Sequence, residues 1–189
     1  MKVYNLICVV FLAMLFVIGI DHFTNAFPIQ WDASHYFEIT RNGLLGNANL
    51  VAPFAYRPGM PLLCRFVGTL FGLMPAESFW WMTRFFAIVS LMVFYWIAWR
   101  VTRSNGQSII LMLVMGLAAP HIKIPLYFSS LVDIAAYPIF GLSFGFLFFD
   151  RPRLAALIAL AGLPFKEFLA IPWLLSCIQV LFAKKLHAN

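Results

Sequence analysis

The chain has 189 residues, of which 63% are hydrophobic and only 11% are charged. A globular domain of this length cannot bury so much apolar surface, so the composition predicts an all-α integral membrane protein. The formal net charge of +6 does not indicate nucleic acid as a partner, because no basic stripe interleaved with polar residues accompanies it. No stretch is polar enough for a separate soluble domain, so we expect residues 1–189 to form a single membrane domain.

The charged residues fall into two groups along the sequence. Nearly all the acids lie in alternate polar breaks, whereas the other breaks carry mainly cations. Flanking Lys and Arg mark the cytoplasmic side of membrane helices, so we expect a plasma (inner) membrane protein with both termini in the cytoplasm. The cationic breaks contain Lys2, Arg100, Arg103, Arg151, Arg153, Lys184 and Lys185.

The apolar runs predict about six membrane segments, since a spanning helix needs roughly 20 apolar residues. Residues 3–20 form the first segment, and we favour an uncleaved anchor over a signal peptide cut after Ala26. The following segments are expected at 79–99, 108–119 and 131–149, and two short helices are expected within 154–182.

Residues 21–78 predict a long first external loop that contains amphipathic interfacial helices. Within it, residues 59–74 are apolar but would extend only about 24 Å as a helix, and Arg65 interrupts them. If this stretch crossed the membrane, the cationic break that contains Arg100 and Arg103 would lie outside the cytoplasm. We therefore expect a helix that lies in the outer interface, where Arg65 can reach lipid headgroups.

The C-terminal third allows two arrangements. Residues 154–182 form either one long helix broken by Pro164 and Pro172, or two short helices that meet within the outer leaflet. We favour two helices because this keeps Lys184 and Lys185 in the cytoplasm. Non-helical backbone at membrane depth is tolerated where it lines a wet cavity.

The external breaks combine acids, a Tyr-Arg-Pro turn at residues 56–58 and a Lys-Glu pair at 166–167. This combination suits a lipid-linked anionic substrate at the membrane surface, with its tail between apolar helices. A carboxylate could act as general base toward an acceptor hydroxyl or hold a divalent metal, and Arg or Lys could bind a phosphate.

Several short motifs carry a resemblance to a known family. Trp-Asp-Ala-Ser-His-Tyr occupies residues 31–36, Pro-Phe-Ala-Tyr-Arg-Pro occupies 53–58 and Pro-Phe-Lys-Glu occupies 164–167. Thr83-Arg84-Phe85 and Val132-Asp133 are shorter matches. Together they resemble the GT-C-fold glycosyltransferases, multispanning enzymes that use polyprenyl-phosphate sugars.

The resemblance implies a catalytic or metal-binding acid in the first external loop, with Asp32 as the leading candidate and Asp21 as the alternative. It also implies that Arg57 and Lys166 lie near the phosphate of a polyprenyl-phosphate-linked sugar. Such enzymes usually have eight or more spans, whereas about six are expected here. The chain is therefore expected to act alone, as one part of a split enzyme with a second membrane subunit, or as a non-catalytic scaffold subunit. Membrane lipids are the other expected partners.

Further candidate substrate-binding residues are His35, Tyr36, Lys123, Asp133 and Glu167. No cofactor is indicated by any motif. Asp32 and His35 are three positions apart and would share a helix face, so a divalent metal such as Mg or Mn is left open.

For the remaining charged residues, the sequence predicts ion-pair partners. Asp133 lies in an apolar helix and needs a partner, which we expect to be Lys123 or Lys166, and a structural pair and a substrate contact both stay open. Because adjacent helical residues point apart, Lys166 and Glu167 are expected to have separate roles. Arg84 is expected to act as an anchor or to pair with Glu77.

Overall fold

The computed structural model describes residues 3–24, 33–44, 57–118, 122–127 and 132–186. Within these ranges the chain is helical and contains no strand, as the composition predicts. The helices are α1 (Val3–Thr24), α2 (Ala33–Asn42), α3 (Gly59–Phe71), α4 (Pro75–Thr102), α5 (Asn105–Leu117), α6 (Lys123–Tyr127), α7 (Asp133–Phe148), α8 (Pro152–Gly162), the short 3₁₀ helix η2 (Glu167–Leu169) and α9 (Ala170–Leu186).

Two helices in the described part of the chain are long and apolar enough to cross a membrane, at Tyr4–His22 within α1 and at Pro75–Thr102. They coincide with the first two predicted spans. The other apolar helices are shorter, so six membrane segments stay a prediction. These shorter helices are Gly59–Phe71, Asn105–Leu117, Asp133–Phe148, Pro152–Gly162 and Glu167–Leu181.

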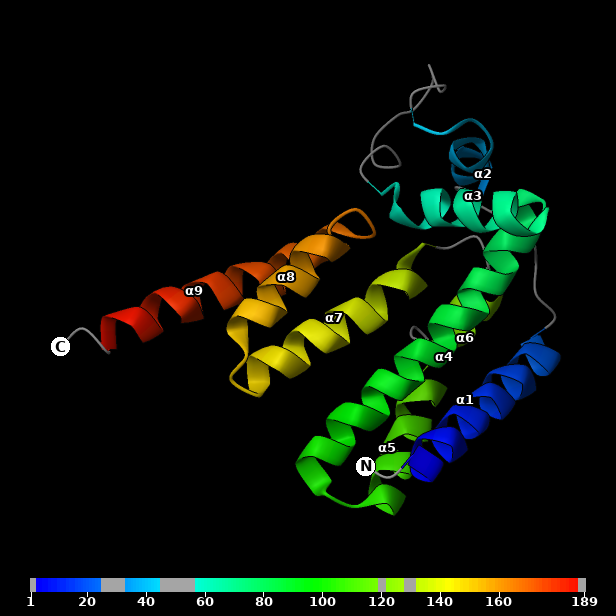
Figure 1. The fold of residues 1–189 in the computed structure, drawn as a ribbon. Helices are drawn as coiled ribbons and strands as arrows, with labels where there is room; N and C mark the ends of the chain where they lie inside the picture. Colours follow the sequence, from blue (N-terminus) through cyan, green and yellow to red (C-terminus); the bar gives the residue numbers. More distant parts are fainter. Residues whose placement is uncertain (1–2, 25–32, 45–56, 119–121, 128–131, 187–189) are drawn as a thin grey trace.

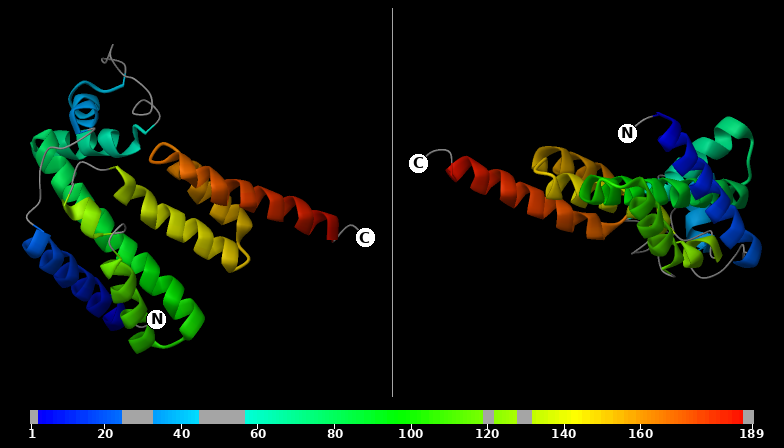
Figure 2. Two further views of the ribbon diagram at one scale, coloured as in Figure 1. Left: turned by 180° about the vertical axis from the view of Figure 1, so that it is seen from behind. Right: turned by 90° about the horizontal axis from the view of Figure 1, so that it is seen from below.

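Helix α4 is the centre of the arrangement. It packs against α1, α5 and α7, while α8 lies on α7 and α9 lies on α8. Short connections reverse the chain after α4 and after α7, so that α4 and α5, and likewise α7 and α8, run in opposite directions (Figures 1 and 2). The C-terminal third therefore forms two helices, α8 and α9, and not one broken helix.

Helix α3 departs from this pattern. Figure 1 shows that it lies across the N-terminal end of α4, and α2 packs against it. Its C-terminal end is set by Gly72, whose positive φ of 68° lets the chain turn directly into α4. Residues 59–71 thus do not run alongside the other apolar helices, and their placement in a membrane interface stays a prediction.

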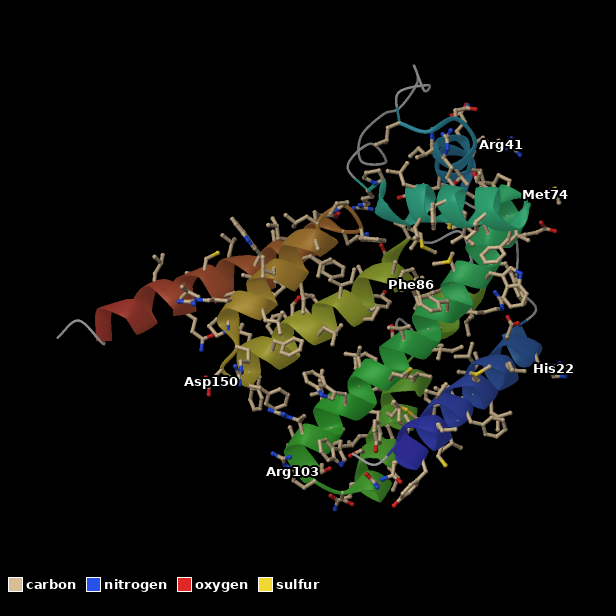
Figure 3. The ribbon with its side chains drawn as sticks, viewed as in Figure 1. His22, Arg41, Met74, Phe86, Arg103 and Asp150 are labelled. Atoms are coloured by element: carbon tan, nitrogen blue, oxygen red, sulfur yellow. The ribbon has the colours of Figure 1, made fainter. Side chains whose placement is uncertain are left out.

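The two ends of the helix bundle differ in the residues they carry (Figure 3). Arg103 and Asp150 lie at one end, here called the Arg103 end, whereas His22, Arg41 and Met74 lie at the opposite end, called the His22 end. Arg151 follows Asp150 directly. The cationic breaks after α4 and after α7 therefore share one end, as the charge pattern predicts.

Packing between the helices uses narrow stripes of small residues. On α1 the buried stripe is Val9, Ala13 and Val17, with a spacing of four. On α7, Gly141 and Gly145 form a small-xxx-small motif, and a Cβ at either position would come within 3.0 Å of Val93 or Trp96 of α4. These glycines allow α7 to approach α4 closely.

Candidate functional site

Three segments that are distant in sequence meet at the His22 end of the bundle. They are the start of α3, the start of α7 and the turn between α8 and α9. The Gly59 N–H donates a hydrogen bond to the Pro164 carbonyl oxygen at 2.8 Å. The ring of Phe165 packs edge-on against Phe86 of α4, with 6.3 Å between the ring centroids. The turn after α8 is thereby fixed against both α3 and α4.

Arg57 and Glu167 form an ion pair with two contacts. Arg57 Nε donates to Glu167 Oε2 at 2.8 Å, and Arg57 Nη2 donates to Glu167 Oε1. The hydrogen bonds from Arg57 lower the pKa of the Glu167 carboxyl below its ordinary value. Conversely, Glu167 raises the pKa of Arg57, and the hydroxyl of Tyr36 on α2 contributes as a weaker hydrogen-bond partner.

Lys166 forms a second ion pair, with Asp133. Lys166 Nζ lies 2.5 Å from Asp133 Oδ1, and both side chains are partly buried. Asp133 is the first residue of α7, where the positive end of the helix dipole also favours a carboxylate. Of the two partners expected for Asp133, the structure pairs it with Lys166. Lys123 begins α6, but its side chain lies outside what the structure describes.

Lys166 and Glu167 therefore have different partners although they are adjacent. Lys166 has an extended backbone, with φ −163° and ψ 135°, whereas Glu167 begins η2. This change of backbone conformation sends one side chain toward α7 and the other toward the start of α3. The two residues therefore do not neutralise each other, although the reason is this change of backbone and not a shared helix, and their separate roles stay a prediction.

Asp21 of α1 is already paired. Arg84 of α4 donates from Nε to Asp21 Oδ2 at 3.1 Å and from Nη2 to Asp21 Oδ1. Arg84 is only 7% exposed. Its guanidinium carbon lies 3.5 Å from the centroid of the Trp80 ring, and its Nη1 donates to the Trp80 carbonyl oxygen at 2.9 Å. This pair ties the C-terminal end of α1 to α4.

The expected pairing of Arg84 with Glu77 is wrong. The Glu77 carboxylate instead accepts a hydrogen bond from the Met74 N–H at 2.8 Å and closes a capping box at the start of α4. Glu77 precedes Arg84 by two helical turns, about 10 Å along the axis. Asp21 reaches Arg84 because α1 packs beside α4.

The remaining candidates lie in or near α2. His35 and Tyr36 are in its first turn; Tyr36 is 2% exposed, whereas His35 is partly exposed. Asp32, the leading candidate for the catalytic acid, lies outside the described residues, so its distance from His35 is not described. Within the described ranges no three His, Cys, Asp or Glu residues come together as a metal site.

The arrangement offers two cations at one end of the bundle, each held in place by a carboxylate. A guanidinium has five N–H donors, and Glu167 engages Nε and Nη2 of Arg57, so donors remain for another anion. Sequence reasoning identified Arg57, Lys166, Asp133 and Glu167 individually. Sequence reasoning missed the contact between Arg57 and Tyr36. Local sequence patterns do not predict which helix packs over the start of α3.

Comparison of the chain with protein-family models, with curated proteins and with solved structures found no match in any of the three.

Proposed function

We propose that the chain is a GT-C-like membrane glycosyltransferase that transfers a sugar from a polyprenyl-phosphate donor on the external face of the plasma (inner) membrane. The observation that carries this proposal is the meeting of Arg57 and Lys166 at the His22 end, from segments that are distant in sequence. Two positioned cations at one end of an apolar helix bundle suit the phosphate of a lipid-linked sugar.

The membrane placement rests on the surface of the helices and on the distribution of charge. Outside its buried stripe, α1 exposes large apolar side chains such as Ile7, Phe11 and Ile18, which suits lipid and not water. In this proposal α1, α4, α5, α7, α8 and α9 are the six membrane segments. The Arg103 end then faces the cytoplasm, together with both termini, and α3 lies in the outer interface.

The proposed chemistry assigns a role to each charged group. The oxygen of an acceptor hydroxyl forms a bond to the anomeric carbon of the sugar while the bond from that carbon to the phosphate oxygen breaks. Asp32 takes the hydroxyl proton, and Arg57 and Lys166 stabilise the negative charge that develops on the leaving polyprenyl phosphate. Asp133 and Glu167 hold the two cations in position. No step is assigned to a metal.

A second candidate function is a non-catalytic membrane subunit that scaffolds a partner chain. One observation favours it: Arg57, Lys166 and Arg84 each already have a carboxylate partner, and these pairs connect segments that are distant in sequence. Ion pairs of this kind can serve the fold alone. In a split enzyme, the same chain would complete its active site together with the second membrane subunit.

The test is a transfer assay with the full chain in lipid membranes that contain polyprenyl-phosphate sugars, with and without candidate partner subunits. Asp32→Asn keeps the size of the side chain and removes its charge, and loss of a positioned base costs about 10²–10⁴ in rate. Asp150→Asn is the matched control, because it makes the same change at the Arg103 end and Asn also tolerates the positive φ of 57° there.

Full activity of Asp32→Asn would move the role of general base to Asp21. A wild-type chain that is inactive with every donor and every partner subunit would favour the scaffold function.

A further inference from the structure

A separate pocket opens at the His22 end between α2, α3 and the start of α4. Its volume is about 370 Å³, about twelve times the roughly 30 Å³ that one water molecule occupies in the liquid. Arg41, which lines it, projects at this end in Figure 3. None of its lining residues belongs to the Arg57–Glu167 or Lys166–Asp133 pair. They are Thr40, Arg41, Cys64, Arg65, Gly68, Thr69, Gly72, Leu73, Pro75 and Ser78.

The charge of this pocket is one-sided. Arg41 and Arg65 both line it, and its lining contains no carboxylate. Both arginines are exposed, and the ion pairs found between described residues involve neither of them. They differ in this respect from Arg57, Arg84 and Lys166, whose charges are compensated. Two guanidinium groups around one cavity, neither with an ion-pair partner among the described residues, favour an anion as its occupant.

The guanidinium of Arg65 lies against the end of α2. Gly43 follows α2 with a positive φ of 74°, and its N–H donates to the Ile39 carbonyl oxygen at 2.8 Å. A Cβ at position 43 would collide with Nη1 of Arg65, so the absence of a side chain there makes room for the guanidinium. The carbonyl end of α2 also attracts a cation.

An unpaired hydroxyl group provides a second, independent observation. Ser78 lines the same pocket, is 0% exposed, and its Oγ has no hydrogen-bond partner. A buried hydroxyl without a partner is unfavourable, and such groups are uncommon in folded proteins. A bound group with acceptor oxygens would supply the missing partner.

We propose that this pocket binds a phosphate group. The planar guanidinium groups of Arg41 and Arg65 would donate to its oxygens, and the Ser78 hydroxyl would donate from the base of the pocket. The phosphate can belong to the headgroup of an anionic phospholipid or to a soluble phosphorylated molecule. The site shares no residue with the proposed transferase centre, so its failure and the failure of that function are distinguishable.

The test measures binding by the full chain, purified in detergent, with isothermal titration calorimetry. The two probes are short-chain phosphatidylglycerol, which carries a lipid headgroup, and glycerol 3-phosphate, which has the phosphate without a tail. Arg41→Gln and Arg65→Gln should each weaken binding roughly tenfold or more, since each removes a charge-assisted contact. Arg103→Gln removes an exposed cation from the opposite end and should leave the affinity unchanged.

Ser78→Ala separates a role in binding from a role in folding. It removes the unpaired hydroxyl, so it should weaken binding severalfold while the thermal midpoint of the ligand-free protein stays the same or rises. Binding of both probes assigns a soluble phosphate compound, whereas binding of phosphatidylglycerol alone assigns a lipid headgroup. The proposal is overturned if neither probe binds, or if the Arg41 and Arg65 variants lose no more affinity than Arg103→Gln.

Discussion

Arg57 and Glu167 are joined by two hydrogen bonds although 110 positions separate them in sequence. The pair connects the turn between α8 and α9 to Arg57, which lies two residues before the start of α3. Next to it, the Gly59 N–H donates to the Pro164 carbonyl oxygen. The C-terminal helices are thereby held against the segment that crosses the end of α4.

This pair should make stability depend on pH in the acidic range. Hydrogen bonds from Arg57 hold the pKa of Glu167 below its ordinary value of 4.5. A carboxyl with a lowered folded-state pKa contributes stability that is fully present above the unfolded-state value and is lost as the pH falls through the folded-state value. The wild type should therefore unfold at a higher temperature than Glu167→Gln above about pH 5, and the difference should vanish well below pH 4.

The measurement is the thermal midpoint of both proteins across this range of pH. Glu38→Gln, at an exposed position on α2, is the matched control and should not reproduce the effect. A difference between wild type and Glu167→Gln that stays constant with pH would contradict the assigned pairing.

Carrier binding should depend on Arg57 and Lys166. Loss of one charge-assisted contact to a phosphate costs about 1.5–3 kcal/mol, or roughly ten- to hundredfold in affinity. Arg57→Ala and Lys166→Ala should weaken binding of a polyprenyl phosphate by this factor, and Arg103→Ala should not. Unchanged affinity in a direct binding assay would restrict Arg57 and Lys166 to a structural role in their ion pairs.

The Asp21–Arg84 pair should matter for folding. Asp21→Asn leaves the Arg84 guanidinium, which is 7% exposed, without a carboxylate. Unpairing a buried charge costs about 3–5 kcal/mol, and because the Asp21 side chain is 23% exposed we expect about 1–3 kcal/mol. Adding Arg84→Gln should restore part of the loss, since no unpaired charge then remains.

This prediction is checked by denaturant unfolding, with Asp150→Asn as the control. An Asp21→Asn protein with unchanged stability but lost transfer activity would show that Asp21, and not Asp32, is the essential acid.

The helices could be predicted from the sequence because their signal is local. Apolar runs predict where α1 and α4 lie, and both helices are long and apolar enough to cross a membrane. Polar pairing is different, because the partner of a charge is decided by which helices pack together. Glu77 is near Arg84 in sequence but caps α4, whereas Asp21 is distant in sequence and reaches Arg84 across the interface between α1 and α4.

The same limit applies to the phosphate pocket. Arg41 and Ser78 carry no motif, and they contribute to one cavity because α3 lies across the end of α4 beneath α2. The hydrophobic periodicity of α3 or of α4 does not predict that the two helices cross. The sequence does report that the acids and the cationic breaks alternate, which is enough to assign Arg57 and Lys166 to the same end.

The orientation of the chain in a membrane gives the last prediction. If α3 crosses the end of the bundle without spanning, reporters fused after Asn49 and after Leu73 should both be external, because they flank α3. Reporters fused after Arg103, Arg153 and Lys185 should all be cytoplasmic, since flanking cations are retained on that side. If the reporters after Asn49 and after Leu73 were on opposite sides of the membrane, α3 would be a membrane span. An external reading at Arg103 would then require seven spans or an inverted chain, and the Arg57–Glu167 pair would lose its place on the external face.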